Sequence, residues 1–182
     1  MKKRVLLFSV CLAIFCSGCK SEGSLIVSPY DQIDTISDVW IEAEQETISP
    51  LGIKIILHNT SERDDLFTGL WFCVEENKDE TWYSLPLPAE TVGFPSVDID
   101  IPTASEIAFG FTDGIHYDSN SEISWQRSPP NEMVFQWEDM YGELPAGNYR
   151  LIICLSSKKD IPLSETSPKY YLSAPFSISC PP

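Results

Sequence analysis

Apolar and polar residues alternate along much of the chain beyond residue 38. In the segments 51–57 and 148–155 every second residue is apolar, a period of two that predicts strands with one buried face. Shorter segments with strand character are 39–41, 70–74, 81–86, 133–137, 170–172 and 176–178. Helix signals are nearly absent. Short strands separated by turn residues predict an all-β antiparallel sandwich or barrel.

The pattern divides the chain into three parts. Residues 1–18 form one part, 19–37 are polar and predict a flexible tether, and 38–182 predict a single sandwich domain. The stretch 86–131 is the least regular, with Pro, Gly, Asp and Ser throughout and short apolar pieces at 97–101 and 107–111.

The N-terminal part has the layout of a secretory signal. Three basic residues at 2–4 precede a short apolar run at 5–15, and Ser17-Gly18-Cys19 supplies a small-residue cleavage site. The apolar run is about half of the roughly 20 residues that a membrane-spanning helix needs. We therefore expect a cleaved signal rather than a transmembrane helix.

A cysteine directly after Ser17-Gly18 resembles the lipobox of bacterial lipoproteins, although Cys16 stands where a lipobox usually has Leu. The resemblance implies that Cys19 is lipidated and becomes the mature N-terminus. The chain would then be anchored to membrane lipid through Cys19, on the extracytoplasmic face of the cell membrane. Stable anchoring requires more than one acyl chain.

Charge excludes one class of partner. The chain has 12 basic and 27 acidic residues, a net charge of −15. Because residues 1–18 contain three of the basic residues and no acidic ones, the mature chain has 9 against 27, a net charge of −18. Such a chain repels nucleic acid and anionic membrane surfaces.

Two motifs resemble a bacterial immunoglobulin-like domain family. They are W-Y-S-L-P at 82–86 and Y-G-E-L-P-A-G-N-Y-R-L at 141–151, the second preceded by Trp137. The resemblance covers 38–180 and implies a Greek-key immunoglobulin-like β-sandwich, found in secreted and lipid-anchored proteins of mainly Gram-positive bacteria. The chain departs from it in having P-P-N at 129–131 instead of P-G, and about 20 extra residues between 100 and 128.

Within this resemblance Tyr149 occupies the place of a tyrosine corner, whose hydroxyl bonds to backbone upstream. Two residues later, antibody domains have the second cysteine of their inter-sheet disulfide, and this chain has Leu151. The inter-sheet disulfide of antibody domains is therefore expected to be absent. Trp137 is expected in the core, and Trp40 and Trp82 at sheet margins.

Three cysteines remain in the mature chain besides Cys19: Cys73, Cys154 and Cys180. Cys73 and Cys154 fall on the outer faces of the segments that correspond to strands C and F of an immunoglobulin domain. If the register places them opposite each other, their Cα atoms lie about 4.5–5.5 Å apart and a disulfide can form. The alternative is two separate, partly covered thiols.

Four aromatic residues lie in the extra segment: Phe109, Phe111, Tyr117 and Trp125. They either cap one end of the sandwich or display a patch for a protein or glycan. We predict that any ligand is met at this aromatic insert, since loops on a rigid scaffold are where recognition concentrates.

Metal and catalytic motifs give little support to other functions. Asp98 and Asp100, and the acidic residues of 113–120, lack the spacing of a calcium loop and are interpreted as solvated carboxylates. The mature chain has no C-x-x-C and only two histidines, which argues against zinc. It also lacks G-x-S-x-G, H-E-x-x-H and phosphate-loop motifs. No catalytic residue and no cofactor are predicted.

These observations predict a non-enzymatic, lipid-anchored extracytoplasmic protein whose one domain is a binding or structural module at the cell envelope. The alternative, from another class, is an accessory lipoprotein that docks to an envelope enzyme or transporter.

Overall fold

The computed structural model describes residues 26–87, 98–109, 112–117, 123–128, 131–158 and 169–179, and for 109, 112–117 and 123–128 it describes the backbone alone. Its elements are β1 (Ile26–Val27), β2 (Val39–Ala43), the 3-10 helix η1 (Gln45–Thr47), β3 (Gly52–Asn59), β4 (Leu66–Lys78), β5 (Thr81–Ser84), β6 (Ile99–Asp100), α1 (Ala104–Phe109), β7 (Thr112–Tyr117), β8 (Ile123–Ser128), β9 (Glu132–Gln136), α2 (Glu138–Tyr141), β10 (Gly147–Ser157) and β11 (Tyr170–Ile178).

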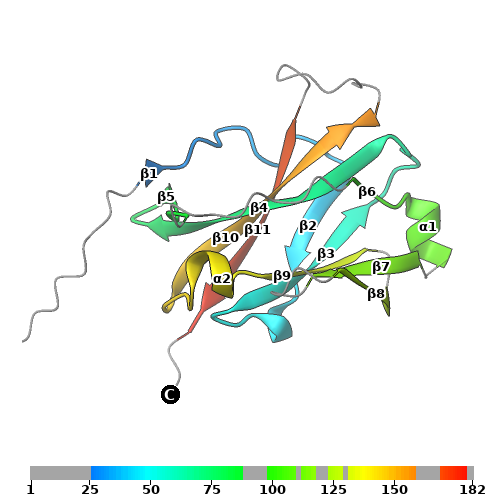
Figure 1. Ribbon diagram of the computed structural model, residues 1–182. Coiled ribbons are helices and arrows are strands. Elements are labelled where there is room, and N and C mark those ends of the chain that lie inside the picture. Colours follow the sequence, from blue (N-terminus) through cyan, green and yellow to red (C-terminus); the bar gives the residue numbers. More distant parts are fainter. Residues whose placement is uncertain are drawn as a thin grey trace, which may run out of the picture.

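These strands form two main antiparallel sheets (Figure 1). The larger sheet has the order β1-β5-β4-β10-β11, with β6 also paired to β4, and the smaller has the order β2-β3-β9. Strands β7 and β8 form a separate two-stranded ribbon, and β7 lies beside β9. The predicted all-β, sandwich-like architecture is confirmed.

Most of the predicted strands are present. In β3 the residues Ile53, Ile55 and Leu57 are buried as the alternation predicted, whereas Leu51 lies just before the strand and is exposed. The apolar piece at 107–111, for which no element was predicted, contributes instead to the short helix α1.

Two segments that were predicted as separate strands on either side of Pro175 form the single strand β11. Proline lacks the N–H that a central strand needs for pairing on both sides. Strand β11 has a full strand partner, β10, on one side only, and Pro175 pairs with Arg150 of that strand. The edge position therefore accommodates the proline without a lost ladder hydrogen bond.

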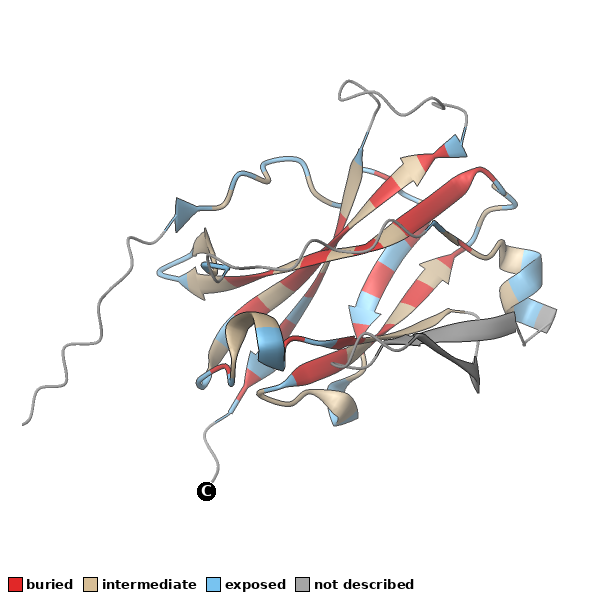
Figure 2. Cartoon of the chain, in the orientation of Figure 1, coloured by how far each residue is buried: buried red, intermediate tan, exposed pale blue. Residues whose placement is uncertain are grey.

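The core lies between the two sheets, where buried residues of both alternate inward (Figure 2). Trp137 is fully buried, as predicted, and its indole Nε1 donates to the carbonyl oxygen of Pro50 at 2.9 Å. Phe176 stacks on both Trp137 and Tyr149, each at 5.6 Å between ring centroids. One aromatic stack thus joins β10, β11 and the end of β9.

Tyr149 forms the corner that the sequence predicted. Its hydroxyl donates to the carbonyl oxygen of Pro145 at 3.0 Å, and its side chain is buried. A Cβ at Gly147 would come within 3.0–3.1 Å of the Tyr149 ring and hydroxyl, so a larger residue would require the ring to shift by a few tenths of an ångström. Gly142 ends α2 at φ 69°, a backbone conformation that glycine adopts without strain.

Residues 26–36, which we call the N-terminal strap, correct the expectation of a flexible tether at 19–37. Strand β1 pairs with β5, and the amide of Ser28 donates to Trp82 O at 2.9 Å. Further along, Ile33 forms a parallel bridge with Tyr171, and Ile36 is buried in the core. Ile33 and Ile36 are isolated apolar residues in a polar segment, so the local sequence pattern did not predict that they pack on the domain.

The strap ends against the free edge of β11. The Asp34 amide donates to Tyr171 O at 2.8 Å, and the Asp34 carboxylate accepts from the amide and the hydroxyl of Ser173 at 2.9 and 2.8 Å. An edge strand with unpaired backbone groups is a site of unwanted pairing. The strap therefore covers part of the edge that also carries Pro175.

Within the described part of the chain, the helices are too short and too polar to cross a membrane.

Candidate functional site

The aromatic insert is described through its backbone only. Phe109 is the last residue of α1, Tyr117 the last of β7, and Trp125 lies within β8 opposite Ile115. Phe111 and the predicted lipid site Cys19 lie outside the described residues. The insert is therefore a β-ribbon beside β9, and whether its side chains cap the core or display a patch stays a prediction.

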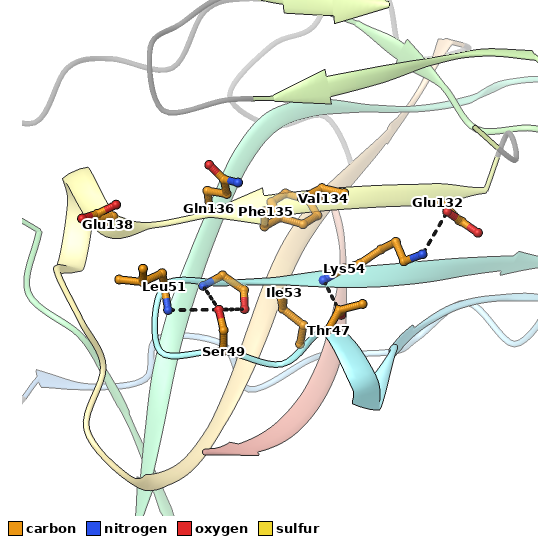
Figure 3. A pocket seen from close by; sticks show the side chains of 11 residues that line it. Thr47, Ser49, Leu51, Ile53, Lys54, Glu132, Val134, Phe135, Gln136 and Glu138 are labelled. Carbon is orange, nitrogen blue, oxygen red and sulfur yellow. Dashed lines mark hydrogen bonds and ion pairs between the residues drawn. The ribbon is translucent and has the colours of Figure 1, made fainter. Parts of the chain in front are cut away.

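Beside this ribbon, the smaller sheet carries an open groove of about 430 Å³ (Figure 3). The turn before β3 and the end of η1 form one side, and β9 and the start of α2 form the other. Its lining residues are Thr47, Ser49, Leu51, Gly52, Ile53, Lys54, Glu132, Val134, Phe135, Gln136 and Glu138. The sequence predicted the strands but no groove, because its residues come from segments about 80 positions apart.

Gly52 allows the two sides of the groove to approach. A Cβ at this position would lie 2.5 Å from the Phe135 carbonyl oxygen, closer than real side chains come. Gly52 pairs with Gln136 across the β3–β9 ladder, so this close contact lies within the lining of the groove. Any larger residue would displace the backbone of β9.

Lys54 carries the positive charge of the groove. Its ammonium lies 2.6 Å from Glu44 Oε2 and 3.2 Å from Glu132 Oε2. The hydrogen bond to Glu44 is the main cause that raises the pKa of Lys54, and Glu132 adds to it. With Lys54 balanced by two carboxylates and Glu138 also on the lining, the groove as a whole is acidic.

The hydroxyl groups of the groove are already used in local structure. Thr47 Oγ1 donates to Glu44 O at 2.7 Å and accepts from the Lys54 amide at 2.9 Å. Ser49 Oγ donates to Gly52 O at 3.1 Å and accepts from two amides of the same turn. A nucleophile needs a neighbouring base to activate it, and neither hydroxyl has one at hydrogen-bond distance.

A flat aromatic surface lies on the same sheet, at Trp40 of β2. The indole stacks on the imidazole of His58, its cross-strand partner, at 4.8 Å between centroids and 6° between planes. Trp40 keeps 40% of its surface exposed. His58 Nε2 lies 3.4 Å from Glu42 Oε2 without the geometry of a hydrogen bond. Stacking on His58 holds the tryptophan in a fixed orientation.

The larger sheet has a polar cluster on its outer side, under the strap. Arg150 Nη2 donates to Glu75 Oε2 at 2.6 Å and to Ser28 Oγ of the strap at 3.2 Å. The guanidinium carbon lies 4.4 Å from the centroid of the Trp82 ring. Glu75 lies two residues from Cys73 on the same outer face of β4, yet it has no exposed surface, and its carboxylate contacts Arg150 and Ser84.

The possible disulfide between Cys73 and Cys154 is not formed, and both are separate, partly covered thiols, the alternative that the sequence left open. The register pairs Cys73 with Ile152, and a bulge between Ile153 and Leu155 shifts Cys154 out of the regular ladder. The two cysteines therefore do not lie opposite each other. Burial, with a contribution from the charge of Glu75, raises the pKa of the Cys73 thiol to about 12. Such a thiol is unreactive at neutral pH.

Among the described residues no three His, Cys, Asp or Glu side chains gather closely enough to hold a metal ion.

Comparison of the chain with models of protein families, with curated proteins and with solved structures found no match.

Proposed function

We propose that this chain is a lipid-anchored, extracytoplasmic, non-catalytic binding module of the cell envelope, with an immunoglobulin-like Greek-key sandwich as its one domain. The observation that carries the location is the order of basic residues 2–4, a short apolar run at 5–15 and Ser17-Gly18-Cys19. A lipidated Cys19 would form the mature N-terminus, and its acyl chains would attach the domain to the extracytoplasmic face of the membrane.

The strand order supports the immunoglobulin-like part of the proposal. Strands β2, β3 and β9 correspond in order to strands A, B and E, and β5, β4, β10 and β11 to C′, C, F and G. The Tyr149 corner lies at the start of β10, where strand F carries it in immunoglobulin-like domains.

Two surfaces of the smaller sheet support binding rather than catalysis. The groove offers carboxylates, an amide and an apolar floor, and its hydroxyls are held by backbone. Trp40 offers a flat apolar ring face next to Glu42. Flat aromatic rings beside hydrogen-bonding groups suit glycans, and β9, which lines the groove, runs beside the aromatic insert at β7.

Labelled palmitate tests the anchor. Cells that express the wild-type chain should incorporate it, and Cys19→Ala should release the protein into the medium. Cys180→Ala is the matched control, because that cysteine lies at the opposite end of the chain, and it should remain labelled and attached. A wild-type protein without label would show that the anchor is wrong.

A glycan array and a pull-down from envelope extract test binding. The variant Gln136→Arg places a long side chain in the groove, and Ser177→Arg places the same side chain on the exposed face of β11. Captured ligand should fall about tenfold or more with Gln136→Arg and stay unchanged with Ser177→Arg. Equal binding by both variants would place the ligand elsewhere, and capture of nothing by the wild type would contradict a binding role.

A further inference from the structure

Exposed apolar side chains of the described residues gather at one edge of the larger sheet. Ile26 and Val27 of β1 are 62% and 60% exposed, and Leu87, three residues beyond the end of β5, is 42% exposed. Strand β1 is the outermost strand of this sheet and pairs only with β5. Single exposed apolar residues are normal on soluble proteins. Three at one edge are typical of a surface that contacts another protein or a membrane.

The register places these residues near the point where the chain leads back to Cys19. Ile26 pairs with Ser84, and Val27 pairs with Tyr83. Because β1 and β5 are antiparallel, the chain before Ile26 and the chain after Ser84 leave the ladder at the same end. Leu87 therefore follows β5 on the side of the ladder that is nearest the N-terminus.

The distance to the proposed anchor is short. Six residues separate Cys19 from Ile26, so a fully extended chain puts β1 within about 25 Å of the lipidated residue. This span is less than the diameter of a small domain, about 30 Å. The ribbon β7–β8 and helix α1 lie at the opposite end of the molecule from β1 (Figure 1). A domain on so short a connection cannot turn that far end to the membrane.

We infer that the β1–β5 edge, with Ile26, Val27 and Leu87, contacts the bilayer surface and holds the domain in one orientation, an inference that rests on the proposed lipid anchor. Exposed apolar side chains next to an acyl anchor add a second attachment at the boundary between headgroups and acyl chains. Tyr83 of β5 is half-buried beside Val27 and belongs to a residue type that favours this boundary.

The charges near the β1–β5 edge indicate which lipid headgroups it can contact. The turn between β4 and β5 carries Asp79 and Glu80, and Lys78 is already paired with Glu76 at 2.9 Å. Anionic lipid would repel these carboxylates, so the edge suits a zwitterionic surface. The same orientation directs the groove-bearing sheet and the insert toward the space outside the membrane.

Hydroxyl-radical footprinting read by mass spectrometry tests the contact. Full-length protein from palmitate-labelled cells is reconstituted in phosphatidylcholine vesicles and compared with soluble Cys19→Ala protein. Oxidation of Ile26, Val27 and Leu87 should fall about threefold or more on vesicles. Oxidation of Trp40 and Leu51 on the other sheet should not change. Equal oxidation of the β1–β5 edge in a labelled, anchored protein would overturn the inference, and absence of the label would overturn the anchor as well.

A matched pair of variants separates contact from simple proximity. Ile26→Ser with Val27→Ser removes exposed apolar surface at the edge, and Leu51→Ser removes an exposed leucine, 40% exposed, beside the other sheet. The double variant should regain oxidation at Leu87 on vesicles, while Leu51→Ser should keep the protection. Unchanged melting temperatures would show that both fold. Protection of Leu87 in the double variant would contradict an apolar contact, and stronger protection on phosphatidylglycerol vesicles would contradict the charge argument.

Discussion

Arg150 and Glu75 face each other across β10 and β4, and the guanidinium donates two hydrogen bonds, at 2.8 and 2.6 Å, to the same carboxylate oxygen. The other oxygen of Glu75 accepts from Ser84 Oγ at 3.0 Å. Glu75 has no exposed surface on the outer side of the sheet, and Arg150 also donates to Ser28 Oγ of the strap at 3.2 Å. The pair therefore links the stability of the sheet to the position of the N-terminus.

Removal of one partner should be costly. Arg150→Ala leaves Glu75 buried without its cation, and we expect it to lower the free energy of unfolding by about 3–5 kcal/mol in urea titrations. Replacement of the pair by Glu75→Leu with Arg150→Met should cost much less, because no charge is left buried. Lys78→Ala breaks the more exposed pair with Glu76 and should cost under about 1 kcal/mol. Equal costs for Arg150→Ala and Lys78→Ala would contradict the buried pair.

The hydroxyl of Tyr149 should contribute measurably to stability. Tyr149→Phe leaves the carbonyl of Pro145 without its donor, and we expect a loss of about 1–3 kcal/mol in the free energy of unfolding. Tyr171→Phe removes a hydroxyl from a half-exposed ring and should change stability by less than about 0.5 kcal/mol. A loss no larger than that of the control would show that the corner hydrogen bond has no net effect.

The strap should stabilise the domain that follows it. A chain that begins at Ser37 should retain a β-type circular dichroism spectrum but lose about 3 kcal/mol or more of unfolding free energy. The loss of buried Ile36 alone accounts for about 1.5–3 kcal/mol, and each strap hydrogen bond adds about 1. A chain that begins at Ile26 keeps the strap and serves as the control. Equal unfolding free energies of the chains that begin at Ser37 and at Ile26 would show that the strap does not stabilise the domain and behaves as the flexible tether that the sequence predicted.

Alkaline pH should destabilise the native state. Burial raises the pKa of Cys73 from about 9 and that of Tyr149 from about 10, each to about 12. The folded state thus keeps both groups neutral at pH values where the unfolded chain ionises. Their contribution is complete below about pH 9 and is lost as the pH rises to about 12. The unfolding free energy should therefore fall between pH 9 and 10.5 relative to pH 7.

Cys73→Ala provides the check on that pH dependence, because it removes one of the two groups and should flatten the fall. In the wild-type protein, iodoacetamide followed by mass spectrometry should find Cys73 and Cys154 alkylated only after unfolding and not joined by a disulfide. A steeper fall in Cys73→Ala would contradict the assigned cause.

Trp125 distinguishes the two roles of the aromatic insert. Trp125→Ala should leave the melting temperature nearly unchanged if the side chain is a binding contact, and lower it clearly if the side chain caps the sandwich. We expect little change, with a loss of captured ligand. Trp137→Ala is the reference for a core tryptophan, which should cost about 3–5 kcal/mol. A drop of similar size for Trp125→Ala would defeat the proposal of a ligand at the insert.

The sequence determined the local elements because their causes are local. Alternation in 51–57 and 148–155 is visible in the residues themselves, since a strand buries every second side chain whatever its partner is. The motif before β10 likewise contains its own turn, its glycine and the tyrosine that bonds back over four residues. Such features needed no knowledge of the rest of the chain.

The tertiary structure decided what depends on pairing between distant segments. The residues of the strap look like a polar tether until Ile33 and Asp34 meet the edge of β11. Glu75 likewise looks like an exposed carboxylate until it meets Arg150 of β10 and is buried. The register pairs Cys73 with Ile152, two residues from Cys154, so the two cysteines do not face each other. Strand register and the burial of outward-facing residues depend on contacts between residues roughly 70–140 positions apart. Alternation predicts which face of the sheet a residue lies on, but not which segment packs against that face.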